Sequence, residues 1–542
     1  MSNQNGKISL TYMLDCSRNA VASVPALRKT AGILKTLGYT GLSLYCENTY
    51  KVQNEPYFGY LNGAYTEDEL RAIDALCADN GLEFSMSVQT LAHMRGVYRF
   101  KDYYQEAIDC NDVLLVGAER TYALIDNMFA TLSRALSSKT VNIGMDEPKM
   151  LGRGKYLDKN GYKPRRQIFA EHLKRVLQTA QRYGLRPLLW GDFMFGRGGA
   201  DDSLTRLVRE YGARVVYWDY GDMRSSDFSA HKERIAANLK RGKELFGSVV
   251  YAGGDWKWIG LAPHNGFALK TAEAALEACA DSGVTDIMLT SWGDTGAEVP
   301  PLAALPVTAY YGYAARGAGG GVPFAEFFNK EFGSLDDFMK LDLANNLSGE
   351  PNYRVNSSSK YLLFADPFLG FTDKSVKPSF AAVYDSHLKK LEAAKNVKPQ
   401  FGYLFAVQRL LIEALRLKFD LGARTRAAYR AHDGPALKSL ADNGYKAAAA
   451  AVRRWFAAFR RGWLADNKPF GLEVHEARVG ALLARLGFCA KRLKEFADGK
   501  TESIPELDCD ILDEYGDGEN IVALNWGEFV SAGTIIEYNS FV

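Results

Sequence analysis

The feature that most constrains the fold is a pattern that repeats through the first three-fifths of the chain. A short apolar or β-branched run is followed by an amphipathic stretch of helical period, and this happens eight times. The runs lie near residues 8–14, 41–46, 82–88, 140–144, 186–190, 214–218, 248–251 and 286–290. Strands that alternate with helices require a parallel sheet, and eight such units can close into a barrel. We therefore predict an α/β fold in which residues 1–315 form a (β/α)8 barrel.

The pattern changes near residue 316. Strand–helix alternation stops, and apolar residues recur every three or four positions, as at Leu404, Val407, Leu411 and Leu415. This spacing is typical of helices that bury one face. Residues 316–542 are therefore predicted to form a mostly α-helical C-terminal domain.

Composition limits the class of protein. The chain has 542 residues, 47% of them hydrophobic, with 66 Lys and Arg against 64 Asp and Glu, which is typical of a globular protein. This near-neutral balance gives no reason to expect a nucleic-acid partner, and no apolar run of about 18 residues predicts a membrane span. The first residues lack the pattern of a secretory signal, and the seven cysteines are scattered. We expect reduced core cysteines in a cytoplasmic protein whose mature chain begins near residue 1.

Aromatic and acidic residues gather after the predicted strands, where barrel enzymes place their catalytic groups. Five of the eight tryptophans lie at or just beyond strand ends, namely Trp190, Trp218, Trp256, Trp258 and Trp292. Any one of them could be a packing residue. Five together, beside carboxylates, favour a sugar-binding pocket, because the C–H faces of a sugar stack on aromatic rings while its hydroxyls need charged acceptors.

The pair Asp146-Glu147 is the sharpest acidic feature. Adjacent residues of a regular strand point to opposite faces, so two carboxylates can share one pocket only where the strand ends and the backbone turns. Pro148 is consistent with such a turn. Because the pair follows an apolar run on the same rim as the tryptophans, we do not expect a solvated surface pair.

Several segments carry a resemblance to a known family. NIGMDEP at 142–148 resembles the catalytic strand-4 motif of glycoside hydrolase family 20, the β-N-acetylhexosaminidases. YMLDCSRN at 12–19 resembles the family's strand-1 motif, and QTLAHM at 89–94 its strand-3 motif. LLWGDF, VYWDYGD, GGDWKWIG, LTSWGDTGAE and SKYLLFADPFLG resemble a subgroup that lacks chitobiase-type accessory modules and ends in a helical domain. Two departures are the absence of the small α/β domain that usually precedes the barrel, and Met145 where glycine is common.

The resemblance implies an exo-acting, retaining β-N-acetylhexosaminidase that removes terminal β-linked GlcNAc or GalNAc from an oligosaccharide or glycoconjugate. Catalysis would be substrate-assisted, through an oxazolinium ion formed by the 2-acetamido group. Glu147 would act as general acid and base, Asp146 would accept the acetamide N–H, and Tyr220 would donate to the acetamide oxygen.

The remaining site residues follow from the same resemblance. The acetamide methyl would be enclosed by Trp190, Trp218 and Trp258, and Trp292 would stack under the ring. Arg18, with Asp294 or Glu298, would bind the ring hydroxyls. His93 is either a sugar contact or a residue that orients the Asp-Glu pair.

Two alternatives stay open from the sequence. One is a glycosidase with a protein nucleophile, in which Asp294 or Glu298 faces Glu147, and the other is a non-catalytic glycan-binding protein. The seven histidines show no metal-ligand spacing and no phosphate-binding loop is present, so neither a metal nor another cofactor is expected. We expect the helical domain to offer surfaces suited to a homodimer.

Overall fold

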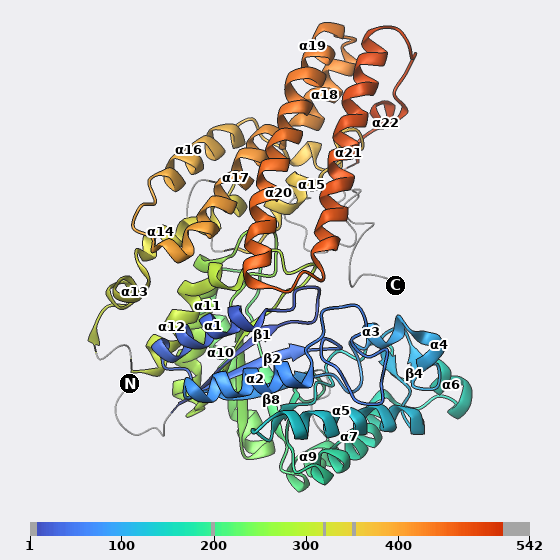
Figure 1. Cartoon of the computed structure of the whole chain (residues 1–542), viewed down its shortest axis with the longest axis vertical. Helices are drawn as coiled ribbons and strands as arrows, with labels where there is room; N and C mark the ends of the chain where they lie inside the picture. Colours follow the sequence, from blue (N-terminus) through green and yellow to red (C-terminus); the bar gives the residue numbers. More distant parts are fainter. Residues whose placement is uncertain (1–7, 197–200, 318–320, 349–353, 513–542) are drawn as a thin grey trace.

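A closed barrel of eight parallel strands forms the first part of the chain (Figure 1). The computed structural model describes residues 8–196, 201–317, 321–348 and 354–512. The barrel strands are β1 (Ser9–Asp15), β2 (Gly41–Cys46), β3 (Glu83–Val88), β6 (Thr140–Asn142), β7 (Arg186–Trp190), β8 (Arg214–Trp218), β9 (Val249–Gly254) and β10 (Asp286–Ser291). Each coincides with a predicted strand, so the predicted fold class is confirmed.

The barrel closes where β1 pairs with β10 on one side and β2 on the other. Leu14 lies opposite Ser291, and Asp15 lies opposite Tyr45, so the ends of these strands meet at one rim. β9 ends three residues later than predicted, and β6 ends two residues earlier. Gly144 (φ 74°) and Met145 (φ 75°) are left-handed there, a conformation that a strand cannot contain.

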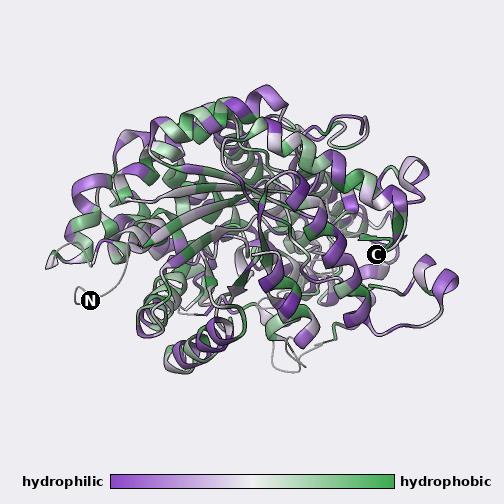
Figure 2. Ribbon diagram, turned by 90° about the horizontal axis from the view of Figure 1, so that it is seen from below, coloured by the Kyte–Doolittle hydropathy of each residue, from purple (hydrophilic) through white to green (hydrophobic). Residues whose placement is uncertain are grey.

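Amphipathic helices surround the barrel, with apolar residues directed to the strands (Figure 2). They include α1 (Val24–Leu37), α2 (Glu67–Asp79), α5 (Glu119–Ala135), α7 (Arg165–Arg182), α10 (Phe228–Phe246), α11 (Asn265–Asp281) and α12 (Leu305–Ala315). At the start of α2 the Thr66 hydroxyl accepts from the Glu69 N–H (3.1 Å) and the Glu69 carboxylate accepts from the Thr66 N–H (2.8 Å). This capping box satisfies two N–H groups that have no partner inside the helix.

Short elements that the sequence pattern does not reveal form a lobe beside the rim (Figure 1). They are α3 (Arg95–Tyr98), α4 (Lys101–Tyr104), α6 (Lys155–Asn160), and an antiparallel pair, β4 (Ile108–Cys110) with β5 (Val113–Leu114). Segments of two to six residues are too short to show a periodicity.

The C-terminal region is helical, as predicted. Its helices are α13 (Phe324–Phe332), α14 (Leu335–Met339), α15 (Ser358–Phe364), α16 (Phe380–Glu392), α17 (Gly402–Lys418), α18 (Leu421–Arg430), α19 (Gly434–Ser439), α20 (Lys446–Asp466), α21 (Leu472–Ala497) and α22 (Pro505–Asp508). Phe328, Phe332 and Phe338 belong to the barrel core, whereas α15 to α22 share a second core. The boundary at residue 316 stays a prediction, and residues 513–542 of the predicted domain lie outside the described residues.

Three further observations concern the described ranges. Seven cysteines are free, five of them buried, while Cys110 is half-buried and Cys509 is exposed, so Cys509 is not the core residue that was expected. None of the helices described is both long and apolar enough to cross a membrane. No three His, Cys, Asp or Glu side chains gather there as a metal site would require, and the expectation of a metal-free protein stays a prediction.

Candidate active site

A cavity of about 200 Å³ lies at the carboxyl ends of the barrel strands. It brings together ten of the eleven predicted site residues, namely Arg18, His93, Asp146, Glu147, Trp190, Trp218, Tyr220, Trp258, Trp292 and Asp294. They come from seven different strands or the loops that follow them, as catalytic groups of barrel enzymes do. The structure thus fixes their positions, while their roles stay predictions.

The Asp146-Glu147 pair lies on a strained turn. Met145 (φ 75°) and Glu147 (φ 46°) are non-glycine residues in the left-handed region, which costs about 1–2 kcal/mol per residue. Gln89 accepts from the Met145 N–H (3.2 Å) and donates to Asp146 Oδ1 (2.7 Å). The Asp192 carboxylate accepts from the Glu147 N–H (2.9 Å). Residues that follow two other strands, β3 and β7, therefore hold the turn in place. Such support is expected where a strained backbone belongs to a functional site.

The two carboxylates differ in exposure. The Asp146 side chain is 13% exposed and the Glu147 side chain 43% exposed. The expectation of a pair shielded from solvent is therefore right for Asp146 and wrong for Glu147. A carboxylic acid at the mouth of a pocket can reach the oxygen that links a group bound in the pocket to a group outside it. An acid buried at the bottom of the pocket cannot reach that oxygen.

His93 pairs with Asp146. Its Nε2 lies 3.3 Å from Asp146 Oδ2 and 3.9 Å from Glu147 Oε2. Burial disfavours the charged imidazole, but the carboxylates of Asp146 and Glu47 outweigh it and raise the pKa of His93 to about 9. For Asp146 burial acts in the opposite direction and favours a higher pKa, yet the charge and hydrogen bond of His93 lower the pKa of Asp146 overall. At neutral pH the two groups form an ion pair, which supports the orienting role for His93.

The raised pKa of His93 predicts a pH-dependent stability. A histidine whose pKa rises on folding stabilises the folded state fully below its unfolded pKa of about 6.5, and this stabilisation disappears as the pH passes about 9. We expect the free energy of unfolding of the wild type to exceed that of His93→Asn by about 1–3 kcal/mol at pH 6. Urea unfolding from pH 6 to 10 measures the difference, and one that stays constant over this range would contradict the ion pair.

Aromatic rings form one wall of the cavity. Trp218 stacks on Tyr220 with ring centroids 5.5 Å apart, and Trp258 meets Tyr220 edge-on at 5.5 Å. Trp292 Nε1 donates to the Tyr220 hydroxyl (2.8 Å), and burial raises the pKa of Tyr220 well above its ordinary value. The hydroxyl thus accepts from Trp292 and keeps a proton that it can donate. Trp256 lies behind this wall, stacked on Trp258 at 4.6 Å.

Arg18 is surrounded by three carboxylates. Its Nε lies 3.2 Å from Asp294 Oδ1 and 3.5 Å from Asp15 Oδ2, and its Nη1 lies 3.1 Å from Glu47 Oε1. Asp15 also accepts from the Gly293 N–H (2.9 Å), so it joins the loops that carry Arg18 and Asp294. This network orients a guanidinium and a half-exposed carboxylate toward the cavity, where sugar hydroxyls can bind both.

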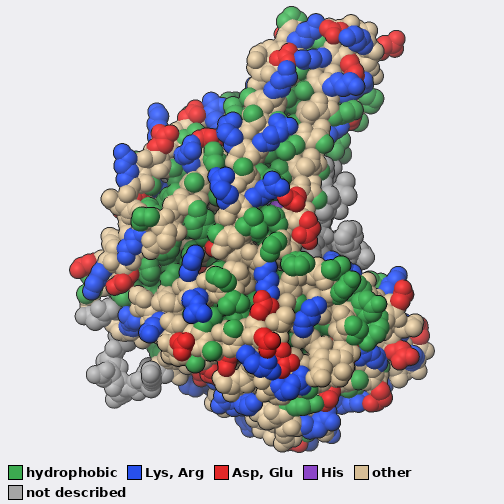
Figure 3. All heavy atoms as spheres, in the orientation of Figure 1, with side chains coloured by type: hydrophobic (Ala, Val, Ile, Leu, Met, Phe, Trp, Pro, Cys, Tyr) green, Lys and Arg blue, Asp and Glu red, His purple; other side chains and the backbone are tan. Residues whose placement is uncertain are grey.

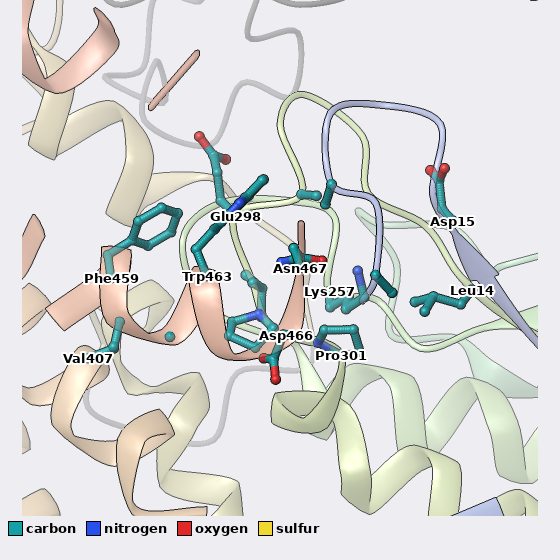
Figure 4. Close-up of a pocket in the computed structure, with 16 residues that line it drawn as sticks. Leu14, Asp15, Lys257, Glu298, Pro301, Val407, Phe459, Trp463, Asp466 and Asn467 are labelled. Atoms are coloured by element: carbon teal, nitrogen blue, oxygen red, sulfur yellow. The ribbon is translucent and has the colours of Figure 1, made fainter. Parts of the chain in front are cut away.

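Glu298 does not line this cavity, which corrects its assignment as a sugar-binding residue. Its side chain is 3% exposed, with Oε2 2.8 Å from Lys360 Nζ and Oε1 3.1 Å from Arg478 Nη1. It borders a separate cavity of about 30 Å³ between the rim and α20 (Figure 4), which is water-sized. Both of its oxygens neutralise cations of the helical domain, so it serves neither a sugar nor a nucleophilic role.

The helical domain holds the loop that carries Trp292 and Asp294. Arg478 Nη1 donates to the Thr295 carbonyl (2.7 Å) and His475 Nε2 donates to the Gly296 carbonyl (2.8 Å). Thr295 (φ 59°), Gly296 (φ 133°) and Ala297 (φ 50°) are consecutive left-handed residues. Such a backbone persists only where its surroundings fix it.

Breaking this buried network should be costly. Replacing Arg478 with methionine leaves Glu298 with one cation fewer in a buried site, so we expect a loss of about 3–5 kcal/mol in the free energy of unfolding. Urea unfolding at pH 7 measures it. Arg453→Met, at an exposed position of α20, should stay within about 0.5 kcal/mol of wild type. Equal effects of the two substitutions would show that the network does not stabilise the fold.

Three further residues, which the sequence places on the rim but not among the predicted site residues, hold the site together. Gln89, Glu47 and Asp192 hold Asp146, Arg18 and Glu147, respectively. All three follow strand ends, which is the only signal that could have found them. Their partners lie on other strands, and a single sequence does not show which loops meet.

One protein family matches the helical part of the chain. Residues 336–523 match the family described as Glycoside Hydrolase 20C C-terminal domain. No curated protein sequence is significantly similar to the chain.

Similar solved structures include three bacterial enzymes. A GH20 exo-β-N-acetylglucosaminidase from Vibrio harveyi is 13% identical, with 58% of this chain and 54% of that chain covered and a TM-score of 0.43. The β-N-acetylhexosaminidase from Bacteroides fragilis is 15% identical, with 60% and 69% covered and a TM-score of 0.43. The N-acetyl-β-hexosaminidase from Streptomyces plicatus is 15% identical, with 62% and 68% covered and a TM-score of 0.40.

The matched region spans about half the length of the Vibrio harveyi enzyme. The barrel is established by the pairing of its own strands. The similarity to family 20 lies in the helical domain. Over residues 336–523 the chain is therefore similar to glycoside hydrolase family 20, as the sequence motifs predict.

Proposed function

We propose that the protein is an exo-acting, retaining β-N-acetylhexosaminidase that removes terminal β-linked GlcNAc or GalNAc from an oligosaccharide or glycoconjugate. One observation carries the proposal. A single cavity joins an exposed acid, Glu147, to an aromatic wall that presents the Tyr220 hydroxyl, and Asp146, the residue before Glu147, lines the same cavity in charge contact with His93. The match of the helical domain to family 20 supports it.

The size of the cavity favours exo action. A volume of about 200 Å³ is below the roughly 300–1,000 Å³ of sites for drug-sized ligands, so it suits one sugar ring with its acetamido group. Arg18 and Asp294 stand where ring hydroxyls can bind them, and the further chain of the glycan must leave past Glu147 at the mouth.

The reaction we propose has two steps. The acetamide oxygen of the substrate attacks its anomeric carbon while the glycosidic bond breaks and Glu147 gives its proton to the leaving oxygen. In the second step water attacks the anomeric carbon, Glu147 takes a proton from that water, and the oxazolinium ring opens. Asp146 accepts the acetamide N–H and stabilises the positive charge, and Tyr220 donates to the acetamide oxygen.

The engaged carboxylates argue against a protein nucleophile. Asp294 pairs with Arg18, Asp146 pairs with His93, and Glu298 lies outside the cavity between Lys360 and Arg478. The exposed acid argues against a non-catalytic binder, which has no need for a proton donor at the cavity mouth.

The test compares two chromogenic substrates. We expect hydrolysis of 4-nitrophenyl β-N-acetylglucosaminide and little or none of 4-nitrophenyl β-glucoside, which lacks the assisting group. A thiazoline analogue of the oxazolinium ion should inhibit competitively and far more tightly than GlcNAc. Covalent labelling of a rim carboxylate by a 2-fluoro glycoside would favour the protein nucleophile, and binding without turnover of either substrate would favour the glycan-binding protein.

We also propose a cytoplasmic location, which the seven free cysteines support, since disulfides are rare in the cytosol. Cell fractionation with an antibody against the protein tests it. The homodimer stays a prediction that light scattering can check.

A further inference from the structure

We propose that an exposed cluster of aromatic rings beside the pocket binds the inner sugar units of the same glycan whose terminal unit occupies the pocket. This aromatic platform consists of Tyr57, Tyr60, Phe100 and Tyr103. The inference rests on the proposed function and assigns a preference for extended substrates. Figure 3 shows hydrophobic side chains, in a colour class that includes tyrosine, gathered over the α3–α4 segment.

The four rings are in mutual contact. Tyr57 lies at their centre, stacked on Phe100 at 5.1 Å and 5.0 Å from the ring of Tyr103. Tyr60 meets Tyr57 edge-on at 5.9 Å and Phe100 at 5.8 Å. Two separate chain segments, the loop after β2 and the loop after β3, supply these rings and meet through them.

The rings are unusually open to solvent. Tyr57 is 39% exposed, Tyr60 46% and Tyr103 42%. Contiguous exposed apolar surface on a folded protein commonly marks a binding site. Tyrosine suits a sugar because its ring face packs on C–H groups and its hydroxyl bonds to sugar hydroxyls. The exposure of these three tyrosines makes their rings and hydroxyls accessible to a ligand.

An ion pair between the buried Glu55 and the half-buried Arg120 supports the platform. Arg120 of α5 binds Glu55 through two contacts, Nη1 to Oε1 (2.7 Å) and Nη2 to Oε2 (2.6 Å). The same guanidinium lies 5.5 Å from the centroid of the Tyr103 ring. Asn127 adds a third hydrogen bond to Glu55 (3.0 Å). A surface held in this way loses little freedom on binding, which favours affinity.

Both loops start at the pocket. The loop after β2 begins at Glu47, which binds Arg18, and the loop after β3 contains His93, which lines the cavity. Their bases are in contact, since a Cβ on Gly96 would lie 2.0 Å from Asn48 Nδ2. From His93 to Phe100 the chain runs through α3, so at most about 20 Å separates them. A glycan leaving the pocket mouth can therefore reach the platform within a few sugar units.

The test measures binding without turnover, on the Glu147→Gln variant, by calorimetry with GlcNAc, chitotetraose and a GlcNAc-terminated biantennary glycan. We expect at least one of the extended glycans to bind more tightly than GlcNAc. Adding Tyr57→Ala or Tyr60→Ala to this variant should raise the Kd for that extended glycan about three- to tenfold, as expected for loss of one stacked ring. The Kd for GlcNAc should stay within twofold. Tyr57→Phe, which keeps the ring, should retain most of the difference in affinity between the extended glycan and GlcNAc.

The control is Phe488→Ala, an aromatic ring of α21 with 47% exposure, which should change no Kd. Equal binding of GlcNAc and both extended glycans, or equal losses for Tyr57→Ala and Phe488→Ala, would overturn the platform. Failure of the wild type to hydrolyse 4-nitrophenyl β-N-acetylglucosaminide would instead overturn the proposed function, and the calorimetric arms would still decide on the platform.

Discussion

Replacing Glu147 with glutamine should lower kcat/KM by about 10²–10⁴-fold on substrates with poor leaving groups, because general acid catalysis contributes that much. Glutamine keeps the shape of the side chain but has no proton to give to the leaving oxygen. Aryl substrates with acidic leaving groups need less protonation, so their first step should slow far less.

The measurement is kcat/KM for a series of aryl β-N-acetylglucosaminides whose leaving groups differ in pKa. The variant should show a steep dependence on leaving-group pKa where the wild type shows a shallow one. Glu233→Gln, at an exposed position of α10, is the matched control and should leave kcat/KM unchanged. Small, uniform losses across the series would mean that Glu147 is not the acid.

Asp146→Asn should reduce kcat/KM by roughly 10²–10³-fold although it hardly changes the shape of the site, since this is the usual effect of removing one preorganised electrostatic partner. The amide lacks the negative charge that stabilises the oxazolinium ion and that pairs with His93 at 3.3 Å. Tyr220→Phe should cause a smaller loss in kcat/KM. This substitution removes the hydroxyl that accepts from Trp292 and that donates to the acetamide oxygen.

The single and double variants should be non-additive, because both residues hold the same acetamido group. We would measure kcat/KM on N-acetyl and N-trifluoroacetyl substrates. Fluorine weakens the carbonyl as a nucleophile, so the wild type should slow markedly on the fluorinated substrate. A flat response, or fully independent effects of the two substitutions, would contradict the assignment of Asp146 and Tyr220.

The barrel is predictable from sequence because its signal is repeated and physical. A buried parallel strand needs a continuous apolar run and its covering helix needs a stripe, so eight repeats leave few alternative folds. The rim follows from the same logic, and this is why residues as distant in sequence as Arg18 and Asp294 could be expected in one cavity. The turn at Asp146-Glu147 was predictable since two neighbouring carboxylates need a break in the strand.

Interactions between loops are not predictable in this way. Glu298 follows β10 as Asp294 does, and only the positions of Lys360 and Arg478 reveal that it belongs to an ion network instead of the cavity. Gln89 acts on a turn 56 residues further along the chain. The lobe around α3 and α4 is not predictable because two single helical turns are too short to show a periodicity. In each case the decisive contact joins segments that are far apart in sequence and become neighbours only in the folded chain.

The left-handed run at Thr295 to Ala297 has a consequence for how this protein can be divided. Its carbonyl groups are held by Arg478 and His475, which belong to α21, nearly two hundred residues downstream. A barrel released from that helix would keep its strands but lose the support of the loop that presents Trp292 and Asp294. The smallest unit able to form the complete cavity therefore includes α21, and the boundary that the sequence pattern draws between barrel and helices is not a boundary of the site.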